Sequence, residues 1–315
     1  MTHTLRLGTR ASQLALTQSQ WCADQVRQVT GLDVELVRIT TTGDITEGSL
    51  ASLGGTGVFA SALRDSLLTG ECDLIVHSLK DLPTADFPGL TIAAIPTREA
   101  SNDTLCSSDG STLEQLAGGA RVGTSSPRRA AQVAHARPDV VLADIRGNVD
   151  TRLAKVQSGE YDAVILAVAG LRRLGRTDAI SEQFELTTWP TSAGQGALGI
   201  ECRAAASDSG LREMIASLTH DTSFMTSMLE RQVLTQLEAG CSAPVGISAI
   251  VSGHMVSVIT AVYANEREDS LHLRNSFRLS ELATASARTQ AAATIVAELV
   301  AMGLSRIPAF SQGSD

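Results

Sequence analysis

Residues 59–83 read F-A-S-A-L-R-D-S-L-L-T-G-E-C-D-L-I-V-H-S-L-K-D-L-P. Phe59 to Leu68 carries apolar side chains at helical spacing, and Asp73 to His77 (D-L-I-V-H) is a short apolar run typical of a buried strand. A strand that follows a helix in this way is half of a parallel β-α-β unit, and repetition of the alternation would indicate an α/β fold.

The alternation continues on both sides of this stretch. Residues 5–7 and 34–40 predict strands around a helix over 11–29, and the pattern restarts after Asn102. There, strands are expected at 120–122, 140–145 and 162–168, with helices from Arg128 and up to about Gln157. Residues 189–199 are rich in Gly and Pro and predict a crossing loop. Beyond them, a helix over 223–237, a strand over 255–263 and an Ala-rich helix over 286–302 predict a small α+β third domain.

Composition limits the classes of function. The 315 residues, 43% hydrophobic and 19% charged, suit two or three globular domains. A net charge of −9 and only 3% aromatic residues disfavour binding to nucleic acid or to an anionic membrane. No apolar run approaches the roughly 20 residues that span a bilayer, and the N-terminal M-T-H-T-L-R-L-G-T-R has no apolar signal region. We therefore expect a cytoplasmic protein.

The five cysteines are widely spaced, and no C-x-x-C or H-x-x-x-H pattern occurs. A disulfide framework is not expected, and no metal site is predicted. Cys241 lies in a Gly/Pro turn, where it is either a small buried apolar residue or a nucleophile.

Two turns between a strand and a helix are candidate anion sites. They are Gly8-Thr9-Arg10-Ala11-Ser12 and Gly123-Thr124-Ser125-Ser126. The N-terminus of a helix offers unpaired N–H groups and a partial positive charge to a carboxylate. Alternatively, Ser12 and Ser126 only cap their helices.

Arginines gather in the second half of the pattern. Residues 121–152 hold six arginines against three acids, a balance of 6 − 3 = +3 in an acidic chain. Arg128, Arg129, Arg146 and Arg152 follow predicted strands, where open α/β sheets place ligands. Because arginine pairs with carboxylates through two hydrogen bonds, these residues predict a ligand with several acid groups. A solvated charged face is the alternative.

The segment His77-Ser78-Leu79-Lys80-Asp81-Leu82-Pro83 follows a buried strand and places an acid beside a base. An ordinary turn would also explain Asp81 and Pro83. Lys80 is one of only two lysines among the 25 basic residues, which favours a functional interpretation. Residues 55–60 fit G-x-G-x-x-A, but no strand precedes them, so a dinucleotide site is not expected.

Seven segments in order along the chain resemble the porphobilinogen deaminase (hydroxymethylbilane synthase) family. They are L-G-T-R-A-S-x-L-A (7–15), V-H-S-L-K-D-L-P (76–83), V-G-T-S-S-P-R-R (122–129), I-R-G-N-V-D-T-R (145–152), Y-D-A-V-I-L-A-V-A-G-L-R-R-L-G (161–175), G-Q-G-A-L-G-I-E-C-R (194–203) and L-E-A-G-C-S-A-P-V-G (237–246). Past about residue 250 the resemblance is loose.

The resemblance implies an α/β fold of two periplasmic-binding-protein-like lobes with mixed, mainly parallel sheets and the active site between them. Residues 1–98 and 197–216 would form lobe 1, residues 102–192 lobe 2, and residues 219–315 the small α+β C-terminal domain that carries the cofactor cysteine. Enzymes of this family are transferases that join four porphobilinogen units, with loss of ammonia, on a covalently attached dipyrromethane cofactor. They release the linear tetrapyrrole hydroxymethylbilane for porphyrin and haem biosynthesis.

Site residues carry over by position. Asp81 matches the catalytic carboxylate, and Cys241 matches the cysteine that forms the thioether to the cofactor. Positions that bind the cofactor are matched by Ser78, Lys80, Thr124, Ser126, Arg128, Arg129, Arg146 and Gly147. Positions that bind the substrate are matched by Arg10, Ser12, Phe59, Arg152, Arg173 and Gln195.

The mobile loop departs from the family pattern. Thr56 and Ser52 stand where many members have lysine, so the charge of that loop is in question. The resemblance implies porphobilinogen as the small-molecule substrate, with no nucleic-acid or membrane partner and a monomeric state. The rival from another class is a solute-binding module that clamps a polyanion without chemistry, and the pairing of Asp81 with Cys241 counts against it.

Overall fold

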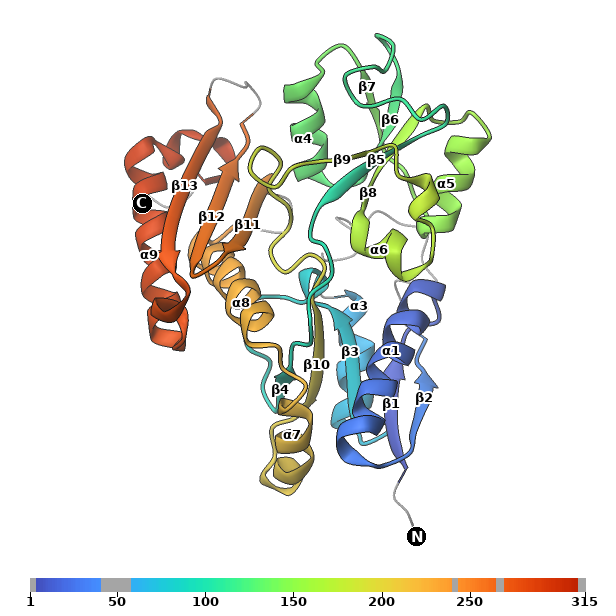
Figure 1. Cartoon of the computed structure of the whole chain (residues 1–315), viewed down its shortest axis with the longest axis vertical. Helices are drawn as coiled ribbons and strands as arrows, with labels where there is room; N and C mark the ends of the chain where they lie inside the picture. The colour runs from blue at the N-terminus through green and yellow to red at the C-terminus, as the bar shows by residue number, and fades with distance from the viewer. Residues whose placement is uncertain (1–3, 41–57, 240–242, 265–268, 311–315) are drawn as a thin grey trace. The chain divides into compact units, whose positions relative to one another are not determined.

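The computed structural model describes residues 4–40, 58–239, 243–264 and 269–310 (Figure 1). The chain forms two compact units, residues 1–99 with 196–224 and residues 100–195 with 225–315. In the described parts of the chain, no helix is both long and apolar enough to cross a bilayer.

Unit 1 is built on a five-stranded sheet in the order β2-β1-β3-β10-β4. The first three of these strands run parallel, and β10 pairs antiparallel with both β3 and β4. The strands are β1 (Leu5–Thr9), β2 (Val34–Arg38), β3 (Leu74–Ser78), β4 (Leu90–Ala94) and β10 (Leu198–Arg203).

Helices cover both faces of this sheet, so its strands are apolar on both sides. Leu74 and Val76 pack in one core cluster with residues of α1 and α7, while Ile75 packs on the opposite face with Leu63 and Leu67 of α3. The helical segments of unit 1 are α1 (Gln13–Thr30), α3 (Val58–Leu68), η1 (Leu79–Asp81), η3 (Ala206–Asp208) and α7 (Ser209–Ala216).

The first sheet of unit 2 repeats this arrangement in the order β7-β6-β8-β5-β9. Three parallel strands are again followed by one that is antiparallel to its neighbours. The strands are β5 (Asp103–Ser107), β6 (Arg121–Gly123), β7 (Val141–Ala143), β8 (Ala163–Ala167) and β9 (Glu182–Gln183), with helices α4 (Pro127–Ala136), α5 (Val149–Gln157), α6 (Val168–Arg173) and η2 (Thr177–Ala179).

A three-stranded antiparallel sheet, β11-β12-β13, completes unit 2 with its own apolar core. The loop after β9 joins it to the first sheet of the unit, because Ile247 N donates to Thr191 O at 2.7 Å and Thr191 N donates to Ser248 Oγ at 2.9 Å. The elements are α8 (Asp221–Gln236), β11 (Val245–Ser252), β12 (Met255–Val262), β13 (Leu271–Arg278), η5 (Leu279–Leu282), α9 (Ala285–Met302), η6 (Leu304–Arg306) and η7 (Pro308–Phe310).

The expected fold class is confirmed: two mixed, mainly parallel sheets and a small C-terminal sheet with helices. Most expected helices and strands are present within one to three residues at each end. Strands β4, β5, β9, β10, β11 and β13 were not among the expected strands, although β11 and β13 show apolar residues at alternate positions. The division into three domains stays a prediction.

Candidate active site

In unit 1, the predicted acid and base follow the end of β3. A single helical turn, η1, is held by the buried side chains of Leu79 and Leu82, and Leu79 N donates to Ala197 O at 2.9 Å. This anchoring leaves Asp81 exposed and Lys80 half-buried. The carboxylate of Asp81 is therefore open to a ligand, and its backbone is fixed by apolar packing on either side.

Arg10 and Ser12 lie at the same edge of the sheet as Asp81, because β1 and β3 are parallel neighbours. Ser12 is the N-cap of α1 and accepts a hydrogen bond from Ala15 N at 3.3 Å. The Ser78 hydroxyl lies 3.3 Å from the side-chain amide nitrogen of Gln18 in α1, which donates to it. Unit 1 thus collects five of the predicted site residues, Arg10, Ser12, Ser78, Lys80 and Asp81, at the carboxyl ends of two strands.

In unit 2, the turn after β6 forms the second predicted anion site. Thr124 is buried, and its hydroxyl accepts a hydrogen bond from Ser126 N at 3.2 Å. Ser126 is the N-cap of α4 and accepts from Arg129 N at 3.4 Å, while Pro127 occupies the first turn. The capping alternative for Ser12 and Ser126 is therefore correct as far as local structure goes, and a cap leaves other N–H groups of the first turn for a ligand.

Arg128 and Arg129 are not on a solvated face, because their side chains are 4% and 8% exposed. Both guanidinium groups pair with one carboxylate, Asp103, at 2.8 Å from Arg128 Nη1 and 2.6 Å from Arg129 Nη2. Burial by itself raises the pKa of the Asp103 carboxyl, but the two guanidinium groups outweigh burial and hold that pKa far below its ordinary value.

Asp103 is the residue that sequence reasoning missed. It also accepts hydrogen bonds from Gln195 Nε2 at 2.9 Å and from Trp189 Nε1 at 3.3 Å. Gln195, a predicted site residue, is fully buried here, with Ser101 O as its second acceptor at 2.7 Å. The only local sign that Asp103 has a special role is its position as a single charged residue directly before T-L-C at the start of β5.

A second pair of arginines lies at the turn after β7. Arg146 is partly exposed, with 41% of its side chain accessible, and its Nε donates to Asp144 at 2.9 Å. Arg152 is half-buried, and its Nε donates to Gly147 O at 2.9 Å. Burial, followed by the like charges of Arg129 and Arg146, lowers the pKa of Arg152 to about 10. The part of this lowering that comes from Arg129 and Arg146 marks a region of positive potential, which a carboxylate would relieve.

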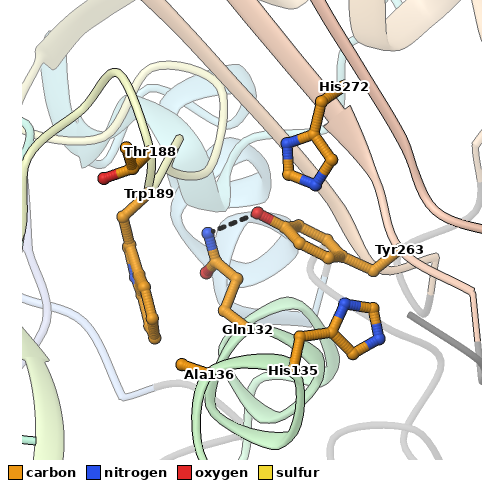
Figure 2. Close-up of a pocket in the computed structure, with 7 residues that line it drawn as sticks. All are labelled: Gln132, His135, Ala136, Thr188, Trp189, Tyr263 and His272. Carbon is orange, nitrogen blue, oxygen red and sulfur yellow. Dashed lines mark hydrogen bonds between the residues drawn. The ribbon is translucent and has the colours of Figure 1, made fainter. Parts of the chain in front are cut away.

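A pocket of about 260 Å³ lies in unit 2, between α4 and the C-terminal sheet (Figure 2). Gln132 of α4 connects the helix to Tyr263, because its Nε2 donates to the Tyr263 hydroxyl at 3.0 Å (Figure 2). Its Oε1 accepts a hydrogen bond from Arg128 Nη1 at 2.6 Å. The orientation of Arg128 is thus coupled to the sheet that follows the Cys241 segment. The pocket is lined by Gln132, His135, Ala136, Thr188, Trp189, Tyr263 and His272.

Two family models match the chain. Residues 5–210 match "Porphobilinogen deaminase, dipyromethane cofactor binding domain", and residues 224–294 match "Porphobilinogen deaminase, C-terminal domain". The chain belongs to the porphobilinogen deaminase family. The resemblance read from the seven sequence segments is therefore confirmed.

Curated relatives agree with this assignment. Porphobilinogen deaminase of Leifsonia xyli subsp. xyli is 48% identical over 305 residues, covering 95% of this chain and 92% of the relative. That of Thermobifida fusca is 44% identical over 306 residues, covering 96% and 95%. Porphobilinogen deaminase 1 of Streptomyces coelicolor is 53% identical over 249 residues, covering 78% and 77%.

A search of solved structures matches the methionine-binding protein MetQ, at a TM-score of 0.44 and 10% identity, covering 72% of this chain and 93% of that one. A periplasmic substrate-binding protein from Coxiella burnetii matches with a TM-score of 0.43 and 12% sequence identity, covering 72% of this chain and 96% of that one. These scores are low, and the fold of this porphobilinogen deaminase family member rests on the strand order of its own sheets.

The remaining predicted residues include Arg173, Phe59 and Cys241. Arg173 ends α6 and is half-buried, and Phe59 lies in the first turn of α3, where only its backbone is described. Cys241 lies outside the described residues, as do Ser52 and Thr56. Their predicted roles stay predictions.

The residues of unit 2 fit a carboxylate-bearing cofactor of the kind named for this family. The pKa of Arg152 is lowered by burial and by neighbouring cations, Arg146 is partly exposed, and the buried Nε of Arg128 has no hydrogen-bond partner among the described residues. Surplus cationic donors of this kind suit several acid groups. Within the described ranges, no cluster of three or more His, Cys, Asp or Glu could hold a metal ion.

Proposed function

We propose that this chain is a hydroxymethylbilane synthase, a transferase of tetrapyrrole biosynthesis. It deaminates four porphobilinogen molecules, joins them head to tail and releases the linear tetrapyrrole hydroxymethylbilane. The observation that carries the proposal is the match of both porphobilinogen deaminase domains, over residues 5–210 and 224–294.

Recognition of the substrate uses charge. Porphobilinogen carries an acetate and a propionate on a small pyrrole ring, and an arginine binds such a group through two parallel hydrogen bonds. Two arginines support carboxylate binding in unit 2: Arg146, which is partly exposed, and Arg152, whose pKa is lowered by burial and by neighbouring cations. In unit 1, Arg10 and Lys80 supply the cations at the edge of the sheet that carries Asp81.

We assign the catalytic role in loss of ammonia and formation of the C–C bond to Asp81. When the protonated aminomethyl group of porphobilinogen leaves as ammonia, its C–N bond breaks, the electron pair departs with nitrogen, and positive charge spreads over the pyrrole ring and its N–H. A fixed carboxylate beside that N–H stabilises the developing cation. The α-carbon of another pyrrole then forms the new C–C bond and loses its proton, which Asp81 is suited to accept as a general base.

The dipyrromethane cofactor, when bound, supplies the pyrrole on which the chain is extended. We assign its thioether to Cys241 and its carboxylates to the arginines and hydroxyls of unit 2. Holding them in place needs a positive, donor-rich surface, which the turns after β6 and β7 supply with Thr124, Ser126, Arg146 and Arg152. A cytoplasmic location and a monomeric state belong to the same proposal and are checked by fractionation and by light scattering.

Two measurements test this function. Incubation with porphobilinogen should release four ammonia molecules per tetrapyrrole, and intact-protein mass spectrometry should find a dipyrrole adduct. Cys241→Ser should lose both the adduct and turnover, whereas Cys202→Ala, at a buried cysteine of β10, should keep both. Binding of porphobilinogen without release of ammonia would instead support the solute-binding module. An unmodified mass in an active preparation would refute the role of Cys241.

A further inference from the structure

Asp103 is a fully buried charge that the proposed chemistry does not use. It begins β5, next to the central β8 of its sheet, and its side chain contacts residues from α4 and from both ends of the loop between β9 and β10. A buried carboxylate loses strong hydration and persists only where partners replace it. Its partners here include three residues of the predicted site, Arg128, Arg129 and Gln195.

The carboxylate of Asp103 accepts as many hydrogen bonds as its two oxygens can hold. Oδ1 accepts from Arg129 Nη2 at 2.6 Å, Arg129 Nε at 3.1 Å and Gln195 Nε2 at 2.9 Å. Oδ2 accepts from Arg128 Nη1 at 2.8 Å and Trp189 Nε1 at 3.3 Å. A carboxylate offers about four lone-pair positions, so these bonds leave no room for a proton or a ligand. Asp103 is therefore not an acid–base group.

The charges of this cluster do not cancel. Two guanidinium groups share one carboxylate, which leaves a net charge of 2 − 1 = +1 in a buried region. Arg129 also contributes to the lowered pKa of Arg152, so its positive charge reaches the second pair of arginines. Asp103 thus makes it possible to bury both guanidinium groups while retaining an excess of positive charge for an anion.

Orientation is the second contribution of Asp103. Without it, two buried like charges in adjacent residues of α4 would repel each other and turn apart. With it, Arg129 is fixed from two sides, since its Nη1 also donates to Ile165 O at 3.0 Å. Arg128 keeps one buried donor, Nε, without a hydrogen-bond partner among the described residues. A ligand carboxylate is a chemically suitable partner for a donor left over in this way.

We propose that Asp103 is a positioning residue for carboxylate recognition: it anchors the side chain of Gln195 and fixes Arg128 and Arg129 so that the remaining donors of these two arginines meet the acid groups of the bound pyrroles. This inference rests on the proposed function and adds to it a residue that touches neither substrate nor cofactor. The inference predicts that replacing Asp103 impairs ligand binding more than it impairs folding.

The chain contains a matched control in unit 1. Asp73 is also a buried aspartate paired with two arginines, at 3.0 Å from Arg6 and 3.4 Å from Arg203. It immediately precedes β3, whereas Asp81 follows that strand at its other end. Asp73→Asn therefore repeats the same chemical change at a second buried aspartate, away from the predicted site, although the arginine partners of Asp73 are more exposed than those of Asp103.

The experiment compares Asp103→Asn with Asp73→Asn at a temperature well below both melting transitions, with cofactor loading checked by intact mass. Asp103→Asn should raise the KM for porphobilinogen by about tenfold or more, with kcat changed less than about threefold, because it removes binding that is shared by ground and transition states. It should also reduce the rise in melting temperature that porphobilinogen produces. Asp73→Asn should lower the melting temperature but leave KM within about twofold.

Asp103→Glu provides a second test if Asp103→Asn does not fold. It keeps the charge but lengthens the side chain by one methylene, so we expect a smaller increase in KM than for Asp103→Asn. Unchanged KM in every folded Asp103 variant, or an equal rise of KM in Asp73→Asn, would overturn the positioning role. A wild-type protein that does not turn over porphobilinogen would instead refute the proposed function itself.

Discussion

Gly147 offers the sharpest test of how the turn after β7 is built. This residue has φ = 108°, lies between Arg146 and the N-cap Asn148 of α5, and accepts a hydrogen bond from Arg152 Nε at 2.9 Å. A Cβ added to Gly147 would lie 2.6 Å from Thr151 Cγ2. Gly147→Ala therefore introduces both backbone strain and a steric clash beside two predicted ligand-binding arginines.

The size of the effect follows from these two sources. Positive φ at a non-glycine residue costs about 1 kcal/mol or more, and forcing a methyl group into a packed site costs about 1–3 kcal/mol. Thr151 cannot easily move away, because its N–H and hydroxyl both hydrogen-bond to Asn148 Oδ1, at 2.9 and 3.0 Å, and its side chain is β-branched. We expect a loss of roughly 3 kcal/mol in the free energy of unfolding for Gly147→Ala.

Gly159→Ala is the matched control at the other end of α5. Gly159 has φ = 78°, but a Cβ there would meet nothing within 4 Å, so only the backbone strain of about 1 kcal/mol applies. At about 2–4 °C per kcal/mol, Gly147→Ala should melt roughly 4–8 °C below Gly159→Ala. Its KM for porphobilinogen should rise about fivefold, since a charged hydrogen bond to Arg152 is weakened.

Differential scanning calorimetry and steady-state kinetics measure both effects. Equal melting temperatures for the two variants would refute the steric argument. A larger loss of stability in Gly147→Ala with an unchanged KM would refute the link between this carbonyl and substrate binding through Arg152.

Three further predictions concern catalysis, thiols and acid stability. Asp81→Ala should cut kcat by about 100-fold or more, keep the covalent adduct and porphobilinogen binding, and change the melting temperature little because Asp81 is exposed; near-normal turnover would contradict its role. The four described cysteines are buried, and burial raises the pKa of Cys106 to about 12, so a thiol reagent should react slowly with the native enzyme. After denaturation it should titrate four of the five thiols if Cys241 carries a thioether and all five if it does not. The Asp103 carboxyl has a lower pKa folded than unfolded, so its stabilisation is present above about pH 4 and is lost as the pH falls below that value. Melting temperatures below pH 4 should therefore depend less on pH in Asp103→Asn than in wild type, and parallel curves would contradict the assignment.

Much of the site was predictable because its signals are local. The apolar run before Ser78 marks the strand, and the L-K-D-L-P that follows marks the turn, so the place of Asp81 at a strand end follows from neighbours in sequence. The N-caps at Ser12 and Ser126 are equally local, because a hydroxyl reaches an N–H only three residues away. Arginine enrichment over residues 121–152 indicates a positive region by composition alone.

The sequence by itself therefore determined the alternating elements, the strand-end turns and the family to which they belong. Only the tertiary structure decided what each arginine does. Arg128 and Arg129 are buried on Asp103, and Arg146 is partly exposed, although all three stand at similar positions after strands. The partners of Asp103 lie 25, 26, 86 and 92 residues away along the chain. No local pattern encodes contacts at such separations, because they arise only when packing of the apolar core brings the start of β5, the start of α4 and the crossing loop together.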